Sequence, residues 1–213
     1  MTKLEALKAL EGEMEADKSL PLSMTSYLVF GEGSPEADVM FIGEAPGFHE
    51  DRLRRPFVGT AGKLLDKLIL EVGWKREGVY ITNIVKRRPP ENRDPLPEEI
   101  EAYKPYLTRQ IEIINPKAIV PLGRYGMNYF LPEAKISRDQ GKVFWVEGRK
   151  IIPMFHPAAA LRAGAVLETL RQSFRKLPEL LKVEEPPKET PTALGDVSKN
   201  DSSKETVKAQ TLF

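Results

Sequence analysis

Short apolar runs alternate with helical patterns along most of the chain. Apolar residues three and four positions apart predict an amphipathic helix near the N-terminus, over residues 3–17. Four β-rich runs predict strands at 39–43, 79–84, 118–122 and 151–156. The segments between them predict helices, chiefly at 62–72, 97–114, 124–130 and 167–181. Strands that alternate with helices form a parallel sheet with helices on both faces, so the pattern predicts an α/β fold.

Distinctive polar residues follow the predicted strands. Gly43 and Glu44 come at the end of the first strand, Asn83 at the end of the second and His156 at the end of the fourth. Ligands of open α/β sheets bind outside the carboxyl ends of the strands. The topology therefore predicts that these side chains meet at one edge of the sheet.

The turn after the first strand carries a second signal. Gly43 and Gly47 allow a ligand to approach the backbone, and the helix that follows offers free N–H groups. Phe57, between Pro56 and Val58, can hold its ring against a flat ligand. The alternative interpretation is an ordinary strand-to-helix turn with a phenylalanine in the core.

The composition narrows the function classes. A chain of 213 residues can bury one substantial core, and a net charge of +1 means that a nucleic acid must be met by a local basic patch. There is no cysteine, which excludes disulfides and thiolate chemistry, and the two histidines are too few for a histidine metal cage. No apolar run approaches a membrane span and no signal core is present, so we expect a cytoplasmic protein.

The polar residues at the strand ends suit the recognition of a planar heterocycle. An asparagine such as Asn83 can form paired hydrogen bonds to a base edge, and an aromatic face such as that of Phe57 can stack on a base. His156 can donate a hydrogen bond to an oxygen that gains negative charge. Taken singly, Asn83 can also cap a turn and His156 can be a satisfied core histidine.

A basic, proline-stiffened loop follows the asparagine strand. It holds Lys86, Arg87, Arg88 and Arg93, and Arg162 lies near the last predicted strand. Such a loop can contact phosphates, which position a protein on DNA without specifying sequence. A solvated charged face is the alternative.

Five motifs in one order give the chain a resemblance to a known family. They are Gly-Glu-Ala-Pro-Gly at 43–47, Pro-Phe-Val-Gly-x-Ala-Gly at 56–62, Val-Tyr-Ile-Thr-Asn-Ile-Val-Lys at 79–86, Arg-Pro-Pro-x-Asn-Arg at 88–93 and Phe-His-Pro-Ala at 155–158. Over residues 21–181 the sequence resembles the uracil-DNA glycosylase superfamily, and most of all its family 4. The resemblance implies a three-layer α/β/α sandwich around a four-stranded parallel sheet.

The resemblance also implies roles for single residues. Glu44, with the backbone of Gly43 and Ala45, would position the attacking water and border the uracil. Phe57 would stack on the base, Asn83 would pair with its edge and His156 would stabilise the uracil anion. The implied reaction releases uracil from DNA, needs no metal and leaves an abasic site. A non-catalytic DNA-binding or uracil-sensing paralogue is the alternative.

One departure from the family concerns a cofactor. Members of family 4 resemble one another in holding a [4Fe-4S] cluster with four cysteines, and the corresponding positions here are Asp17, Leu20, Arg87 and Tyr103. A thiolate-held cluster cannot form in this chain, so we expect no cofactor. We expect an Asp17–Arg87 ion pair and a Leu20–Tyr103 contact in its place. Relatives that trap uracil covalently carry Gln at the position of Glu44, so covalent trapping is not expected.

The composition changes near the C-terminus. Proline and serine among charges predict a disordered tail over residues 184–213, after one catalytic domain over residues 1–183. The segment 208–213 ends in Gln210, Thr211, Leu212 and Phe213 and resembles a sliding-clamp docking peptide. A terminus without function is an equal alternative. We expect a monomer whose partner is uracil-containing DNA.

Overall fold

The sheet at the centre of the molecule has six strands in the order β1-β3-β2-β4-β6-β5. The computed structural model describes residues 1–184, so the predicted tail and docking peptide lie outside the described residues. Four central strands are parallel: β3 (Tyr80–Asn83), β2 (Val39–Gly43), β4 (Ala118–Pro121) and β6 (Arg149–Ile151). The α/β prediction is therefore confirmed.

The predicted number of strands is wrong by two. The edge strands β1 (Glu32–Gly33) and β5 (Phe144–Val146) pair antiparallel with β3 and β6. They hold two and three residues, which is too short for an alternating apolar pattern to show in the sequence.

The last parallel strand begins and ends earlier than the predicted range 151–156. Regular pairing stops at Ile151, and beyond it a single bridge joins Met154 to Leu122. Pro153 lies between them, and because proline has no N–H it interrupts the ladder. The chain nevertheless stays beside β4, because Met154 N–H donates to the Pro121 carbonyl at 2.9 Å. His156 therefore still emerges at the end of the sheet where β2 and β3 end.

Five long helices match predicted ranges. They are α1 (Lys3–Ala16), α3 (Thr60–Glu71), α4 (Pro97–Ile114), α5 (Gly123–Phe130) and α8 (Gly164–Leu180). The sequence did not predict the short helices, which span one or two turns and so show no period: α2 (Phe48–Leu53), α6 (Ile136–Asp139), α7 (Pro157–Ala160) and the 3₁₀ turns η1 (Arg76–Gly78) and η2 (Pro90–Asn92). No helix within residues 1–184 has both the length and the apolar composition of a bilayer span.

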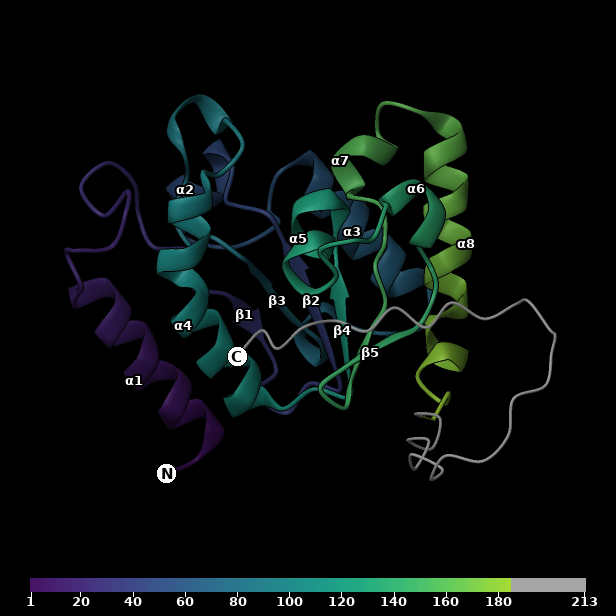
Figure 1. Ribbon diagram of the computed structural model, residues 1–213, viewed down its shortest axis with the longest axis horizontal. Helices are drawn as coiled ribbons and strands as arrows, with labels where there is room; N and C mark the ends of the chain where they lie inside the picture. Colours follow the sequence, from purple (N-terminus) through teal and green to yellow (C-terminus); the bar gives the residue numbers. More distant parts are fainter. Residues whose placement is uncertain (185–213) are drawn as a thin grey trace, which may run out of the picture.

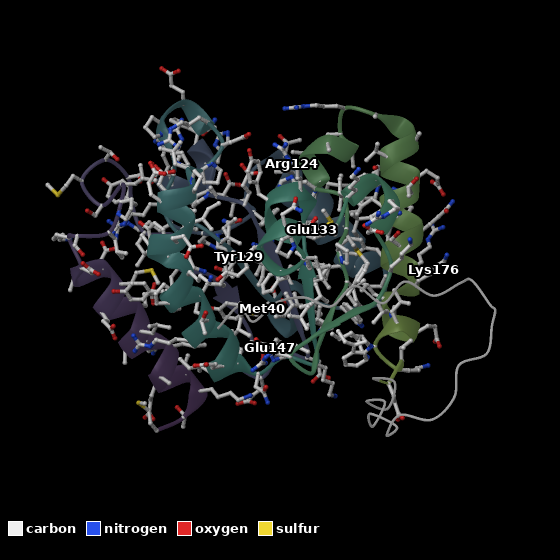
Figure 2. The ribbon with its side chains drawn as sticks, in the orientation of Figure 1. Met40, Arg124, Tyr129, Glu133, Glu147 and Lys176 are labelled. Carbon is white, nitrogen blue, oxygen red and sulfur yellow. The ribbon has the colours of Figure 1, made fainter. Side chains whose placement is uncertain are left out.

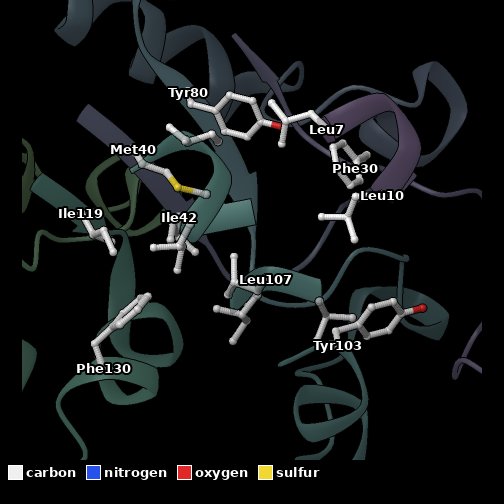
Figure 3. Packing of buried hydrophobic residues seen from close by; sticks show 14 of the residues in the cluster. Leu7, Leu10, Phe30, Met40, Ile42, Tyr80, Tyr103, Leu107, Ile119 and Phe130 are labelled. Carbon is white, nitrogen blue, oxygen red and sulfur yellow. The ribbon is translucent and has the colours of Figure 1, made fainter. Parts of the chain in front are cut away.

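Alternate residues of β2 face two separate apolar clusters, which gives three layers. Met40 and Ile42 pack in a cluster with residues of α1, α4 and α5, and Figure 3 shows them with Leu107 and Phe130. Val39 and Phe41 belong to the cluster that contains residues of α3 and α8. In Figure 1, α1 and α4 lie to one side of the sheet and α8 to the other.

The two ends of the sheet differ in what covers them. In Figure 1, both α2 and α7 lie at the upper end. Figure 2 shows Arg124, the second residue of α5, toward this end, and Glu147, in the turn between β5 and β6, toward the opposite end. The carboxyl ends of β2, β3 and β4 therefore face α2, α5 and α7.

Candidate functional site

A pocket of about 590 Å³ opens at the carboxyl ends of the parallel strands. Its lining includes Glu44 and Ala45 after β2, Asn83 at the end of β3, and His156 before α7. Phe57 joins them from the loop that precedes α3. The volume lies within the range of small-ligand sites. The structure thus brings together the side chains that sequence reasoning placed at this edge.

Gly43 allows Phe57 and Asn83 to approach each other. A Cβ built on Gly43 would lie 2.6 Å from Cζ of Phe57 and would also clash with Oδ1 of Asn83. The Phe57 ring is buried, and its centroid lies 5.6 Å from that of His156, with 31° between the ring planes. Any side chain at position 43 would therefore displace the ring or the amide.

The loop that carries Phe57 is held by two residues that the sequence analysis missed. Phe57 has a φ of +52°, in the left-handed region that costs a non-glycine residue about 1–3 kcal/mol. Glu50 Oε1 accepts the Val58 and Gly59 N–H groups at 2.9 and 2.8 Å. Arg76 donates to the carbonyls of Pro56 at 2.6 Å and Phe57 at 3.3 Å.

Arg76 is itself fixed by carboxylates. Its Nε donates to Glu32 at 2.7 Å, and its Nη1 pairs with Asp66. No sequence motif marks these residues, because Glu32, Asp66 and Arg76 meet only in the folded chain. Glu50 lies between two of the family motifs, and nothing in the sequence distinguishes it from the other charged residues of α2.

Asn83 carries the one buried side-chain amide with an unpaired nitrogen in residues 1–184. Its side chain is 1% exposed, and Nδ2 has no hydrogen-bond partner in the described part of the chain. A buried donor without a partner costs about 1–3 kcal/mol. Because Asn83 lines the pocket, the same atom is positioned to donate to a ligand held there.

His156 presents a neutral imidazole to the pocket. It is the N-cap of α7, and its Nδ1 accepts the Ala158 N–H at 3.1 Å, which leaves the proton of the neutral ring on Nε2. Burial lowers the pKa of His156 to about 4, with Glu50 opposing the shift. At pH 7 the ring is therefore uncharged, with Nε2–H as a donor.

Glu44 has the opposite shift. Burial, aided by the nearby charge of Asp94 and opposed by Arg124, raises the pKa of Glu44 to about 7. Asp94 is held by the Tyr125 hydroxyl and lies 3.6 Å from the Arg124 guanidinium. Glu44 is thus a carboxyl group that changes protonation near neutral pH, as a group that handles protons or positions water requires.

The prediction that Lys86 and Arg87 contact DNA is wrong. Lys86 is fully buried, and its Nζ donates to the Thr82 hydroxyl at 2.6 Å and to the Gln110 amide oxygen. Burial lowers the pKa of Lys86 well below its ordinary value. Arg87 is 2% exposed and donates to the Ser26 carbonyl at 2.6 Å. Neither cation can reach a phosphate from the interior of the fold.

The other three predicted DNA contacts have different surroundings. Arg162 is exposed and lines the pocket. Arg88 Nε donates to Asn92 at 2.7 Å, and Arg93 forms a two-pronged pair with Glu99 at 2.6 and 2.9 Å. Arg162 is thus the predicted cation with direct access to a bound ligand.

The residues at the family's cluster positions do not fit an iron–sulfur group. The chain has no cysteine, and no group of three or more His, Cys, Asp or Glu side chains within residues 1–184 is placed to hold a metal. Leu20 is buried in the same apolar cluster as Tyr103, and the Tyr103 hydroxyl donates to the Pro21 carbonyl at 2.6 Å.

The expected Asp17–Arg87 ion pair is also wrong. Arg87 Nη2 pairs instead with Glu15 at 3.1 Å, and Glu15 lies in the last turn of α1. Asp17, the C-cap of α1, accepts from the Tyr106 hydroxyl at 2.9 Å. The N-terminal segment is therefore attached to α4 and to the chain after β3 by hydrogen bonds and an ion pair.

Comparison with known proteins agrees with this geometry. A sequence profile described as "Uracil DNA glycosylase superfamily" matches residues 30–179. A type-4 uracil-DNA glycosylase of Sulfurisphaera tokodaii is 44% identical over 83% of this chain and 86% of its own. Proteins of the same name from Archaeoglobus fulgidus and Saccharolobus solfataricus are 41% and 50% identical, over 86% and 71% of this chain and 97% and 74% of theirs. The chain belongs to the uracil-DNA glycosylase superfamily.

Proposed function

We propose that the protein is a uracil-DNA glycosylase, which hydrolyses the N-glycosidic bond of deoxyuridine in DNA and leaves an abasic site. The observation that carries this proposal is the unpaired amide nitrogen of Asn83, buried in a pocket with an aromatic ring, a neutral imidazole and a carboxyl group. The relatives named type-4 uracil-DNA glycosylase support it.

Base recognition follows from the donors and acceptors of Asn83. Uracil presents a carbonyl acceptor at O4 and a donor at N3–H, which match the Nδ2 and Oδ1 atoms of one asparagine. The base must leave the helix to reach this amide, at a cost of a few kcal/mol. Stacking on Phe57 returns part of that cost.

Bond cleavage needs stabilisation of separated charges. As the C1′–N1 bond breaks, its electron pair passes to uracil and the negative charge spreads to O2, where Nε2–H of His156 donates. The sugar gains oxocarbenium character, which an ionised Glu44 stabilises. Glu44 also orders the water whose oxygen bonds to C1′, and the released proton passes to this carboxylate or to solvent.

We further propose that residues 1–183 form a catalytic unit that acts as a monomer, inside the cell, without a cluster. The clamp-docking role of residues 210–213 remains a hypothesis. Deleting residues 207–213 and measuring the affinity for a sliding clamp tests it, since unchanged affinity contradicts docking by this peptide.

A product assay tests the main proposal. Purified protein is incubated with an oligonucleotide that contains one uracil, and free uracil is quantified while alkali cleaves the abasic strand. We expect one uracil for each strand cut, and none from the matched thymine oligonucleotide. Binding of the uracil strand without release of uracil would favour the non-catalytic alternative.

A further inference from the structure

An aromatic ring with two guanidinium groups borders the mouth of the uracil pocket. Phe48, the first residue of α2, is 45% exposed and follows directly on the pocket-lining Gly47. The guanidinium carbons of Arg88 and Arg52 lie 5.2 and 5.6 Å from its ring centroid. We call these three residues the rim platform.

The rim platform is also connected to the pocket through Arg88. Arg88 Nε donates to Oδ1 of Asn92, and Asn92 itself lines the pocket. Asn92 and its neighbour Glu91 have φ angles of +54° and +55°, so the loop tip that carries the Asn92 acceptor holds a strained conformation.

The charges of the platform are not neutralised within residues 1–184. Neither Arg52 nor Arg88 forms an ion pair with a carboxylate of that region, whereas Arg55, Arg76 and Arg93 each do. Nearly half of the Phe48 surface remains exposed, although both guanidinium groups lie over its ring. A half-exposed ring with two cations over it, neither held by a carboxylate within residues 1–184, matches a nucleotide, whose flat base can stack on the ring and whose phosphates can pair with the cations.

We propose that the rim platform binds the nucleotide next to the flipped uracil in the same DNA strand. Arg52 and Arg88 leave the ring to pair with the phosphates that flank this nucleotide, and its base takes their place on Phe48. A base that stacks on protein has left its neighbours in the duplex, so the platform adapts the protein to uracil in single-stranded DNA. This inference rests on the proposed function for the identity of the base in the pocket.

A double-mutant cycle that combines substitution of Phe48 with removal of a DNA base tests the platform. Wild type and Phe48→Ala are each titrated with single-stranded oligonucleotides in which the base on the 5′ or the 3′ side of uracil is either present or replaced by an abasic analogue. Affinity is read by fluorescence anisotropy and uracil release by single-turnover kinetics. Phe48→Tyr restores an aromatic ring, and Leu4→Ala, 50% exposed on α1, is the matched surface control.

We expect Phe48→Ala to bind the intact strand about tenfold more weakly than wild type. For one of the two flanking bases, removing the base should not weaken the affinity of Phe48→Ala further, because its stacking partner on the protein is already absent. Wild type, Phe48→Tyr and Leu4→Ala should each lose affinity when that base is removed. Additive effects at both positions, or unchanged affinity of Phe48→Ala, would overturn the proposal.

The two readouts separate this inference from the proposed function. If Phe48→Ala and removal of a flanking base have non-additive effects on affinity but the wild type releases no uracil, the platform is supported and the glycosylase activity is contradicted. Uracil release without coupling at either flanking base would do the reverse.

Discussion

The buried side-chain amides of Asn83 and Gln110 differ in their hydrogen bonding. Gln110 of α4 is fully buried and paired at both ends: its oxygen accepts from Lys86, and its nitrogen donates to the Phe30 carbonyl at 3.0 Å and the Tyr80 hydroxyl at 3.3 Å. Asn83 is 1% exposed, and its nitrogen has no partner in residues 1–184. Of the two amides, the paired one helps to hold the fold together and the unpaired one lines the pocket.

The same contrast extends to the surroundings of each amide. Around Asn83 lie a strained Phe57 backbone, a histidine with a lowered pKa and a glutamate with a raised pKa. Beside Gln110, the buried amine of Lys86 has no carboxylate partner within residues 1–184 and donates to the Thr82 hydroxyl and the Gln110 oxygen instead. Substitutions near Asn83 should therefore change activity, and substitutions near Gln110 should change stability.

The largest expected effect is that of Asn83→Ala. Loss of the base-reading amide should lower kcat/KM for uracil release about 10³-fold, with little change in Tm because no protein hydrogen bond is lost. Gln110→Ala is the matched control and should destabilise the fold by about 2–3 kcal/mol while sparing activity well below its Tm. Single-turnover kinetics and thermal unfolding measure both. A large drop in the Tm of Asn83→Ala, or a loss of activity in folded Gln110→Ala, would contradict the assignment of Asn83 to the site and of Gln110 to the fold.

The next effect is that of pH on Glu44. The pKa of Glu44 is about 7 and that of His156 about 4, so of these two pocket residues it is Glu44 that titrates between pH 5 and pH 8. Activity should fall about hundredfold from pH 8 to pH 5 as the carboxylate takes up a proton. A pH–rate profile with no limb near pH 7 would contradict a role for the ionised carboxylate.

Stability should respond to the same group with the opposite sign. The folded pKa of Glu44 is raised above its ordinary value of 4.5, so the unfolded chain binds fewer protons and stability falls as the pH rises from about 4.5 through 7. Glu44→Gln should therefore stabilise the fold at pH 8 by about 1 kcal/mol, with no gain at pH 4. Its kcat/KM should lose the limb near pH 7.

A smaller effect is expected from Glu50→Ala. Without the acceptor for the Val58 and Gly59 N–H groups, the strained loop relaxes and Phe57 leaves its stacking position. Uracil release should fall about tenfold, mainly through KM. Glu179→Ala removes a carboxylate from an exposed pair with Lys182 and should leave the kinetics unchanged. Equal kinetics of both variants would show that Phe57 needs no support from Glu50.

The smallest effect concerns the N-terminal attachment. Glu15→Ala leaves the buried Arg87 without its ion-pair partner and should cost about 1–2 kcal/mol, or about 2–8 °C in Tm, with activity retained. Asp17→Ala should cost less, because Asp17 forms no ion pair with the buried Arg87. If Asp17→Ala lowers the Tm more than Glu15→Ala does, the result would favour the predicted Asp17–Arg87 ion pair.

The pocket residues were predictable because parallel strands end at the same edge of a sheet. Asn83, Glu44 and His156 follow different strands, and topology alone brings their side chains together. The four central strands and the five long helices were predictable for the same kind of reason, because their apolar periods are long enough to read.

Lys86 shows why the remainder was not predictable. The chain stays extended past β3, as the hydrogen bonds from Ile84 and Val85 N–H to the carbonyls of Gly43 and Glu44 show. Thr82 and Lys86 therefore lie on one face, toward α4, where Gln110 provides a partner from 24 residues away. A run of basic residues gives no sign of that partner, and the same holds for Arg76 and its carboxylates.

Nuclear magnetic resonance of the side-chain amides tests the central claim most directly. Protein labelled with ¹⁵N is titrated with uracil, and the NH₂ resonances of Asn83 and Gln110 are assigned by their Ala variants. A new hydrogen bond to uracil should shift the Asn83 signals while those of Gln110 stay in place. Saturating uracil that leaves the Asn83 signals unmoved would contradict the account.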